Sequence, residues 1–234
     1  MNKILVPTDF SEQADNALRV AAQLAKKYNA EIYLLHLLEL PLNQVDALNS
    51  HSDLPEAVFF MKLANKRFKE VLEKDYLEEV TVHETIEFHQ AFDGIMETCK
   101  KNNIDLIVMG SHGVSGLKEM FIGSNTEKVV RASDVPVLVI KNRHNDFDVN
   151  DFVFASNFKE NNKKTFLQAV KLAEAFDAIL HLVLVNTANN FISTEKANAR
   201  IAEFVKDSKH QNFKTIIYND ESIERGILNY SQGI

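Results

Sequence analysis

Short apolar runs alternate with amphipathic segments along residues 1–141, and this alternation limits the possible folds more than any other feature. A short apolar run between turn signals is typical of a buried strand, whereas an apolar stripe of helical period, such as Ala14 to Tyr28, is typical of a helix. The predicted strands are Lys3 to Thr8, Glu31 to Leu38, Glu79 to Glu87, Ile104 to Gly110 and Pro136 to Lys141. Alternating strands and helices predict an α/β fold with a parallel sheet.

The same pattern begins again later in the chain. The polar stretch 142–150 has no hydrophobic period and is predicted to be a linker. Further strands are expected at Asp151 to Ser156, Ala178 to Val185 and Phe213 to Tyr218, with helices around Phe166 to Phe176 and Glu221 to Tyr230. We therefore expect a complete domain at 1–141, followed by a diverged and incomplete second copy at 151–234.

The composition argues against several classes of protein. A formal net charge of -7 disfavours general binding to nucleic acid. Because no apolar run approaches the roughly 18 residues of a membrane-spanning helix and no signal peptide precedes the first strand, we expect a cytoplasmic protein without a membrane partner. Cys99, the single cysteine, falls on an apolar helical face and is expected to be buried. No metal site is expected, because the eight histidines lack the spacings of zinc enzymes.

Two loops at predicted strand ends carry unusual chemistry: Pro7-Thr8-Asp9 after the first strand and Gly110-Ser111-His112-Gly113 after the fourth. If these strands are neighbours, one crevice joins the loops, as in other open parallel sheets. Gly110, Gly113 and Gly123 can present backbone N–H groups without interference from a Cβ atom. Gly123 and Ser124 lead into a predicted helix start, which favours a phosphate.

Simpler roles are open for some of these residues. Ser124 and Glu127 have the spacing of a capping box, which stabilises a helix start without any ligand. Asp9 could cap the first helix, or it could accept hydrogen bonds from a ribose or help to hold a divalent ion. Ser11 could supply the cap instead of Asp9.

Three stretches resemble the universal stress protein family: residues 1–11, Leu34 to Leu37, and 104–140, IDLIVMGSHGVSGLKEMFIGSNTEKVVRASDVPVLVI. The spacing Gly110-x2-Gly113-x9-Gly123-Ser124 resembles that of the family's ATP-binding branch. The resemblance covers 1–141, and the later part looks like the second repeat of a tandem member.

The resemblance implies a five-stranded sheet in the order 3-2-1-4-5, with helices on both faces and ATP, ADP or AMP at the ends of strands one and four. It places Pro7, Thr8, Asp9 and the backbone of Leu37 beside adenine and ribose, and Met109 and Gly110 beside the ribose. It places His112, Gly113, Gly123, Ser124 and Asn125 around the phosphates, and Thr126 matches a family threonine. A magnesium or manganese ion could accompany the phosphates, without a dedicated ligand cluster.

The second copy departs from this pattern where the chemistry needs it. Ala155, Ser156 and Asn157 stand where the first copy has Pro7, Thr8 and Asp9, and no second glycine loop follows. We therefore expect one nucleotide site per chain, and a second copy that is a structural or regulatory partner.

Three functions remain open at this point. The first is a stress-response regulatory protein that binds an adenine nucleotide, with the connection 39–54 folding over it. The second is a slow ATPase or phosphotransfer enzyme, although the lysine loop G-x4-G-K-[ST] is absent. The third is a scaffold with an incidental ligand site, paired through Val135 to Ile140 as a homodimer or intramolecular pseudo-dimer.

Overall fold

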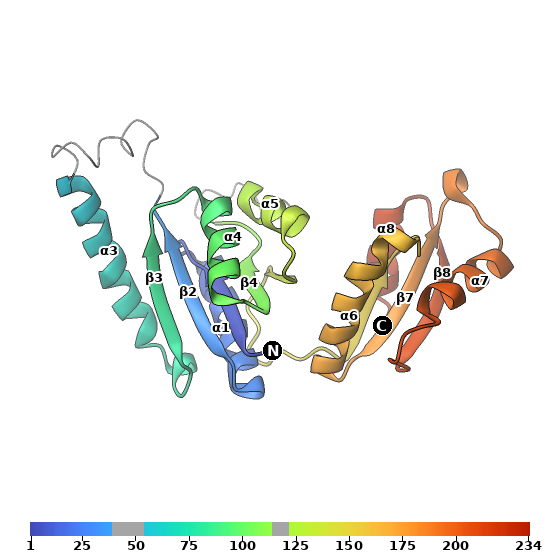
Figure 1. The fold of residues 1–234 in the computed structure, drawn as a ribbon, viewed down its shortest axis with the longest axis horizontal. Helices are drawn as coiled ribbons and strands as arrows, with labels where there is room; N and C mark the ends of the chain where they lie inside the picture. Colours follow the sequence, from blue (N-terminus) through green and yellow to red (C-terminus); the bar gives the residue numbers. More distant parts are fainter. Residues whose placement is uncertain (39–53, 114–121) are drawn as a thin grey trace. The chain divides into compact units, whose positions relative to one another are not determined.

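The computed structural model describes residues 1–38, 54–113 and 122–234. It divides into two compact units, Met1–Phe147 and Asp148–Ile234 (Figure 1). In the described part of the chain, no helix is long and apolar enough to cross a membrane. Most of the connection 39–54, which the sequence predicts to fold over the nucleotide, lies outside the described residues.

The first unit contains a five-stranded parallel sheet in the order β3-β2-β1-β4-β5, which confirms the predicted order. Its strands are β1 (Lys3–Pro7), β2 (Glu31–Leu37), β3 (Val82–Glu87), β4 (Leu106–Gly110) and β5 (Val137–Ile140). Its helices are α1 (Glu12–Tyr28), α3 (Leu54–Leu72), α4 (Ala91–Asn102) and α5 (Ser124–Ala132), with a 3-10 turn at Asp75–Leu77. This turn and a left-handed Glu79, at φ 64°, delay β3 by three residues relative to the predicted start.

Helices cover both faces of this sheet, with α4 and α5 on one face and α1 on the other (Figure 1). On the face of α4 and α5, Leu5, Leu35 and Ile107 pack against Ile95 and the other apolar side chains of the two helices. The packing positions the carboxyl ends of β1 and β4 side by side, since Leu5 pairs with Ile107.

Cys99 lies in this core, as predicted, with 6 % of its surface exposed. Burial raises the pKa of its thiol to about 11. A thiol in this environment stays protonated at neutral pH and behaves as a small apolar side chain.

The second unit repeats the beginning of this architecture with a three-stranded parallel sheet in the order β6-β7-β8. Its strands are β6 (Asp151–Ala155), β7 (Ile179–Asn186) and β8 (Phe213–Asn219). Its helices are α6 (Lys163–Phe176), α7 (Thr194–Val205) and α8 (Ile223–Ser231), with 3-10 turns at Glu160–Asn162 and Ala188–Asn190. Helix α7 was not predicted from the sequence.

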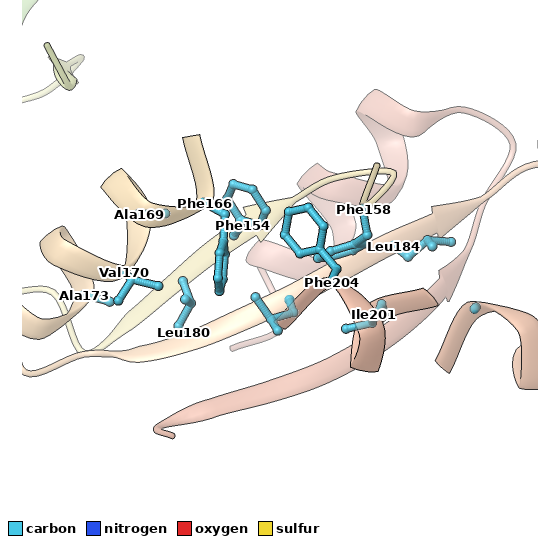
Figure 2. Close-up of a cluster of buried hydrophobic side chains, with 12 residues drawn as sticks. Phe154, Phe158, Phe166, Ala169, Val170, Ala173, Leu180, Leu184, Ile201 and Phe204 are labelled. Atoms are coloured by element: carbon cyan, nitrogen blue, oxygen red, sulfur yellow. The ribbon is translucent and has the colours of Figure 1, made fainter. Parts of the chain in front are cut away.

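Phenylalanines dominate the core of the second unit (Figure 2). Phe166 on α6 lies edge-on to Phe154 on β6 and to Phe204 on α7, with ring centroids 5.6 and 5.3 Å apart. Phe158 meets the same rings of Phe154 and Phe204 at 6.0 and 5.4 Å. Such edge-to-face contacts tie both helices to one face of the sheet.

The start of the predicted linker belongs to the first unit. Gln23 on α1 donates from Nε2 to the His144 carbonyl at 3.1 Å, and its Oε1 accepts from the Phe147 N–H at 2.7 Å. The boundary between the units therefore falls between Phe147 and Asp148, inside the predicted linker 142–150.

Candidate ligand site between strands one and four

A cavity of about 370 Å³ opens where the strand order reverses, at the carboxyl ends of β1 and β4. This is the usual position of ligand sites in open α/β sheets, and the volume lies within the roughly 300–1,000 Å³ of small-molecule pockets. Its lining consists of Pro7, Thr8, Asp9, Ala14, Leu35, Leu37, Ala91, Ile95, Met109, Gly110, His112, Gly113, Asn125 and Thr126. The structure thus brings together the predicted site residues except Gly123 and Ser124.

The loop after β1 is held by its own side chains. Thr8 Oγ1 accepts from the Phe10 N–H at 3.0 Å, and Asp9 Oδ1 accepts from the Ser11 N–H at 3.0 Å. Phe10 is left-handed at φ 61°, which turns the chain into α1. Ser11 then caps the helix by accepting from the Ala14 N–H at 3.2 Å. Of the two candidate N-caps of α1, the structure therefore selects Ser11 and not Asp9.

An aromatic layer supports this loop from behind. His36 on β2 donates from Nδ1 to the Thr8 carbonyl at 2.7 Å. Phe10 lies against the rings of His36 and Phe68, with centroids 4.6 and 5.2 Å away. His36 is therefore explained by packing and one hydrogen bond, and the described residues contain no group of three or more His, Cys, Asp or Glu that could hold a metal ion.

Two glycines are required by close approach rather than by backbone conformation, since no described glycine has a positive φ. A Cβ atom on Gly113 would lie 2.2 Å from Oδ2 of Asp9. One on Gly110 would lie 2.9 Å from the backbone carbon of Gln13 in α1. Gly113 thus lets the Asp9 carboxylate reach the backbone of the β4 loop, and Gly110 lets α1 approach β4.

The loop after β4 is tied to α5 and β5 by hydrogen bonds. Thr126 Oγ1, on a buried side chain, donates to the Gly110 carbonyl at 3.0 Å. The Gly123 N–H donates to the Ser111 carbonyl at 2.8 Å, and the Ser111 N–H donates to the Ile140 carbonyl at 3.0 Å. The loop itself therefore uses the Gly123 N–H as a donor, and the placement of Gly123 at a phosphate stays a prediction.

The predicted capping box at the start of α5 does not form. Gly123 is the N-cap, and no side chain makes a capping hydrogen bond there. Glu127 instead accepts from Nε of Arg131 at 2.9 Å, one turn further along the helix. The first-turn N–H groups of α5 consequently lack the Ser124 hydroxyl as an acceptor, and Asn125 and Thr126 from that turn line the cavity.

Four lining residues were missed by the sequence analysis: Ala14, Leu35, Ala91 and Ile95. Leu35 is the register partner of Pro7. Ala91 and Ile95 lie one turn apart on α4, the helix that packs on β2. Together with Leu37 they form an apolar wall, which the predicted strand order and the alternation of side chains along β2 could have revealed.

A five-stranded parallel sheet with a crevice between its first and fourth strands defines a doubly wound α/β protein. The Universal stress protein family matches residues 1–141, and the chain belongs to that family.

Relatives support this assignment for the first unit. The chain is 34% identical to Universal stress protein MJ0577 of Methanocaldococcus jannaschii over 155 residues, which cover 61% of this chain and 96% of that protein. It is 35% identical to Universal stress protein YxiE of Bacillus subtilis over 147 residues, covering 60% of this chain and 99% of the relative. A solved structure of MJ0577 superposes on 61% of this chain and 97% of its own, with 29% identity and a TM-score of 0.52.

A likeness of fold extends over both units. The crystal structure of a universal stress protein from Archaeoglobus fulgidus covers 99% of this chain and 83% of its own, with 22% identity and a TM-score of 0.70. At this identity the comparison shows the fold alone.

Proposed function

We propose that this universal stress protein is a cytoplasmic stress-response regulator whose first unit binds ATP or a related adenine nucleotide, ADP or AMP. One observation carries the proposal: segments 7–9, 109–113 and 125–126, distant in sequence, meet around one cavity at the switch point of the sheet. These are the segments that the resemblance to the family's ATP-binding branch singles out.

The cavity suits an adenosine on one side. Leu35, Leu37 and Ile95 offer an apolar wall for a planar base. Asp9 is the one acidic residue among the described residues of the lining, and carboxylate oxygens are strong acceptors for ribose hydroxyls.

The opposite side suits phosphates. Gly113, His112 and the start of α5 at Asn125 lie there, and the positive end of a helix dipole favours an anion. In the described part of the lining, Asp9 is also the one carboxylate that a magnesium or manganese ion could use, so we expect such an ion to take most of its ligands from the phosphates and water.

Regulation is favoured over efficient catalysis. None of the described residues that line the cavity is a lysine or an arginine, the side chains that phosphoryl transfer uses to stabilise developing charge. We expect ATP hydrolysis to be slow or absent. A bound nucleotide would then act by stabilising one conformation over another, which requires a different affinity for the two.

We further propose that the protein forms a homodimer through β5. This strand lies at the edge of the five-stranded sheet, and Val137, Leu138 and Val139 are only half-buried in the single chain. Exposed edge strands readily pair with another chain. Light scattering at micromolar concentration should report a dimer, and a monomer would contradict this part of the proposal.

Calorimetry with ATP, ADP, AMP and GTP on the full chain tests nucleotide binding. Asp9→Ala should weaken binding of the preferred adenine nucleotide by about 1.5–3 kcal/mol, the value of a hydrogen bond to a charged group. Gly113→Ala should weaken it as well, because the added Cβ would displace the Asp9 carboxylate. Glu12→Ala is the matched control, since this exposed carboxylate lies three residues from Asp9 and outside the cavity. Unchanged affinity in Asp9→Ala, or no nucleotide binding to the unmodified chain, would refute the proposal.

A further inference from the structure

The second unit has a larger cavity, of about 770 Å³, at the carboxyl ends of β6 and β7. Three of its features matter here: the loop after β6 (Ser156, Asn157 and Lys159), Arg200 on α7, and an apolar wall of Phe191, Ile223 and Ile227. Among the described residues, β6 is the edge strand of its sheet, and no strand equivalent to β4 pairs with it.

The loop after β6 reproduces the loop after β1. Ser156 Oγ accepts from the Phe158 N–H at 3.0 Å, and Asn157 Oδ1 accepts from the Lys159 N–H at 3.1 Å. Phe158 is left-handed at φ 51°, as Phe10 is in the first unit. Asn157 therefore occupies the position of Asp9.

The helix over the cavity is also reproduced. A Cβ on Gly226 of α8 would lie 2.6 Å from Val185 of β7, just as one on Gly94 of α4 would lie 2.4 Å from Leu37 of β2. Counting from these glycines, Ile223 and Ile227 correspond to Ala91 and Ile95 of the first cavity. The two cavities are thus equivalent places in two copies of one architecture.

The side chains of Asp9 and Asn157, at equivalent positions in the two loops, differ in hydrogen-bonding character. In the first unit Asp9 Oδ1 is bound to the loop, while Oδ2 is the oxygen directed at Gly113. In the second unit Asn157 Oδ1 accepts from the Lys159 N–H and from Asn162 Nδ2, the latter at 2.8 Å, so the orientation of the amide is determined. Its Nδ2 then takes the place of Oδ2, and a donor replaces a charged acceptor.

The charged residues that line the two cavities also differ: the first cavity has an acidic residue and the second has basic ones. Lys159 and Arg200 line the second cavity, and none of the lining residues that the structure describes is Asp or Glu. Arg200 Nη1 donates to the backbone carbonyl of Asn157 at 3.4 Å, which holds the guanidinium at the loop that carries the Asn157 side chain. The cavity is therefore lined by an amide donor, a guanidinium and an ammonium group together with an apolar wall.

We propose that the second unit binds an organic anion, a molecule with a carboxylate or phosphate head on an apolar body. Arg200 and the Asn157 amide donate to the head, and Lys159 adds charge. The planar guanidinium matches both carboxylate and phosphate oxygens. The apolar body lies against Ile223, Ile227 and the exposed ring of Phe191, which is 70 % accessible. The ligand class thus differs from the ribose-bearing ligand proposed for the first unit.

Phenylacetate and phenyl phosphate are suitable probes, with the neutral phenylacetamide as the matched control ligand. In a titration of the isotope-labelled full chain followed by NMR, both anions should shift the backbone amides around Asn157, Phe191 and Ile223. They should bind about tenfold more tightly than phenylacetamide, since the amide lacks the charged head. The ratio of the two anions identifies the preferred head. Equal affinity for phenylacetamide, or shifts confined to other regions, would overturn the proposal.

Variants sharpen this test. Asn157→Asp retains the loop, because Asp9 makes the same turn in the first unit, but it places a carboxylate against the anion and should weaken binding about tenfold or more. Arg200→Gln should have a similar effect, whereas Lys171→Gln, at an exposed position on α6 outside the cavity, should have none. Unchanged anion binding in Asn157→Asp would contradict the proposal. Nucleotide binding is tested by calorimetry with variants of the first unit, and anion binding is tested with variants of the second. Either proposal can therefore be refuted while the other stands.

Discussion

The two units share a turn, a helix-to-strand contact and a cavity position, yet they present opposite chemistry at the same point. Asp9 offers a carboxylate where Asn157 offers an amide donor, in loops with the same hydrogen bonds. The backbone turn needs only a side-chain oxygen to accept one N–H, and both residues supply it. The second side-chain atom is what differs, a carboxylate oxygen in Asp9 and an amide nitrogen in Asn157.

Their packing differs as much as their chemistry. Alanines of α1, among them Ala17 and Ala21, lie on the sheet of the first unit, whereas phenylalanines fill the second. At equivalent positions on the other face, Lys3 lies over the ring of Tyr33 at 5.6 Å in the first unit. In the second unit Asp151 lies 2.7 Å from buried His181, which also contacts the Tyr230 hydroxyl at 2.5 Å. One architecture therefore tolerates different cores and charges.

The largest expected effect separates the two cores. Phe166→Ala should lower the free energy of unfolding of the second unit by about 3–5 kcal/mol, because it removes a ring that contacts both Phe154 and Phe204. Calorimetric scanning should show the second unit melting earlier while the transition of the first stays in place. Leu167→Ala, at the next and exposed position of α6, should change little. An equal shift of both transitions would show that the units do not unfold separately.

A smaller effect tests the shared glycine contact. Gly226→Ala should destabilise the second unit by about 1–3 kcal/mol, because the new methyl meets the β-branched Val185. The corresponding Gly94→Ala should cost less, since the Cδ atoms of Leu37 can rotate away and alanine favours the helix by roughly 1 kcal/mol. Urea unfolding gives the unfolding free energy of both variants. A greater loss of stability in Gly94→Ala than in Gly226→Ala would contradict this prediction.

The smallest expected effect is a pH dependence of the unfolding free energy that arises from Cys99. The first unit contains this cysteine and the second unit has none. Burial raises its pKa from 9.0 to about 11 in the folded state, so above about pH 9 the unfolded chain loses this proton first. The unfolding free energy should therefore fall between about pH 9 and pH 11, with no contribution below that window. Denaturant titrations give the unfolding free energy of the unmodified chain and of Cys99→Ala at each pH. The difference between the two chains should change only within this window, and a constant difference across it would contradict the burial of the thiol.

Much of this architecture could be predicted from short apolar runs, because buried strands need them regardless of context. The strand order and the site came from a resemblance carried by residues such as Asp9, Gly110 and Gly113. Helix α7 was not recognised, since Ala197, Ile201 and Phe204 are its only buried residues and most of the remainder is polar or exposed. Which face of α7 is buried depends on its packing against the phenylalanine core of the second unit.

Helix capping shows why local patterns were insufficient. Ser124 and Glu127 have the right spacing for a capping box, but the Gly123 N–H bonds to the Ser111 carbonyl, twelve positions earlier, and the helix begins one residue earlier than the box requires. At Asp9, the left-handed turn at Phe10 decides between two candidate caps. Both outcomes depend on contacts outside the local sequence.

The stoichiometry of ATP binding tests most directly whether the two cavities are of different kinds. Titration calorimetry on the full chain should give one adenine nucleotide per chain, lost or strongly weakened in Asp9→Asn and retained in Asn157→Asp. Two nucleotides per chain, or equal binding in the unmodified chain and Asp9→Asn, would contradict the account.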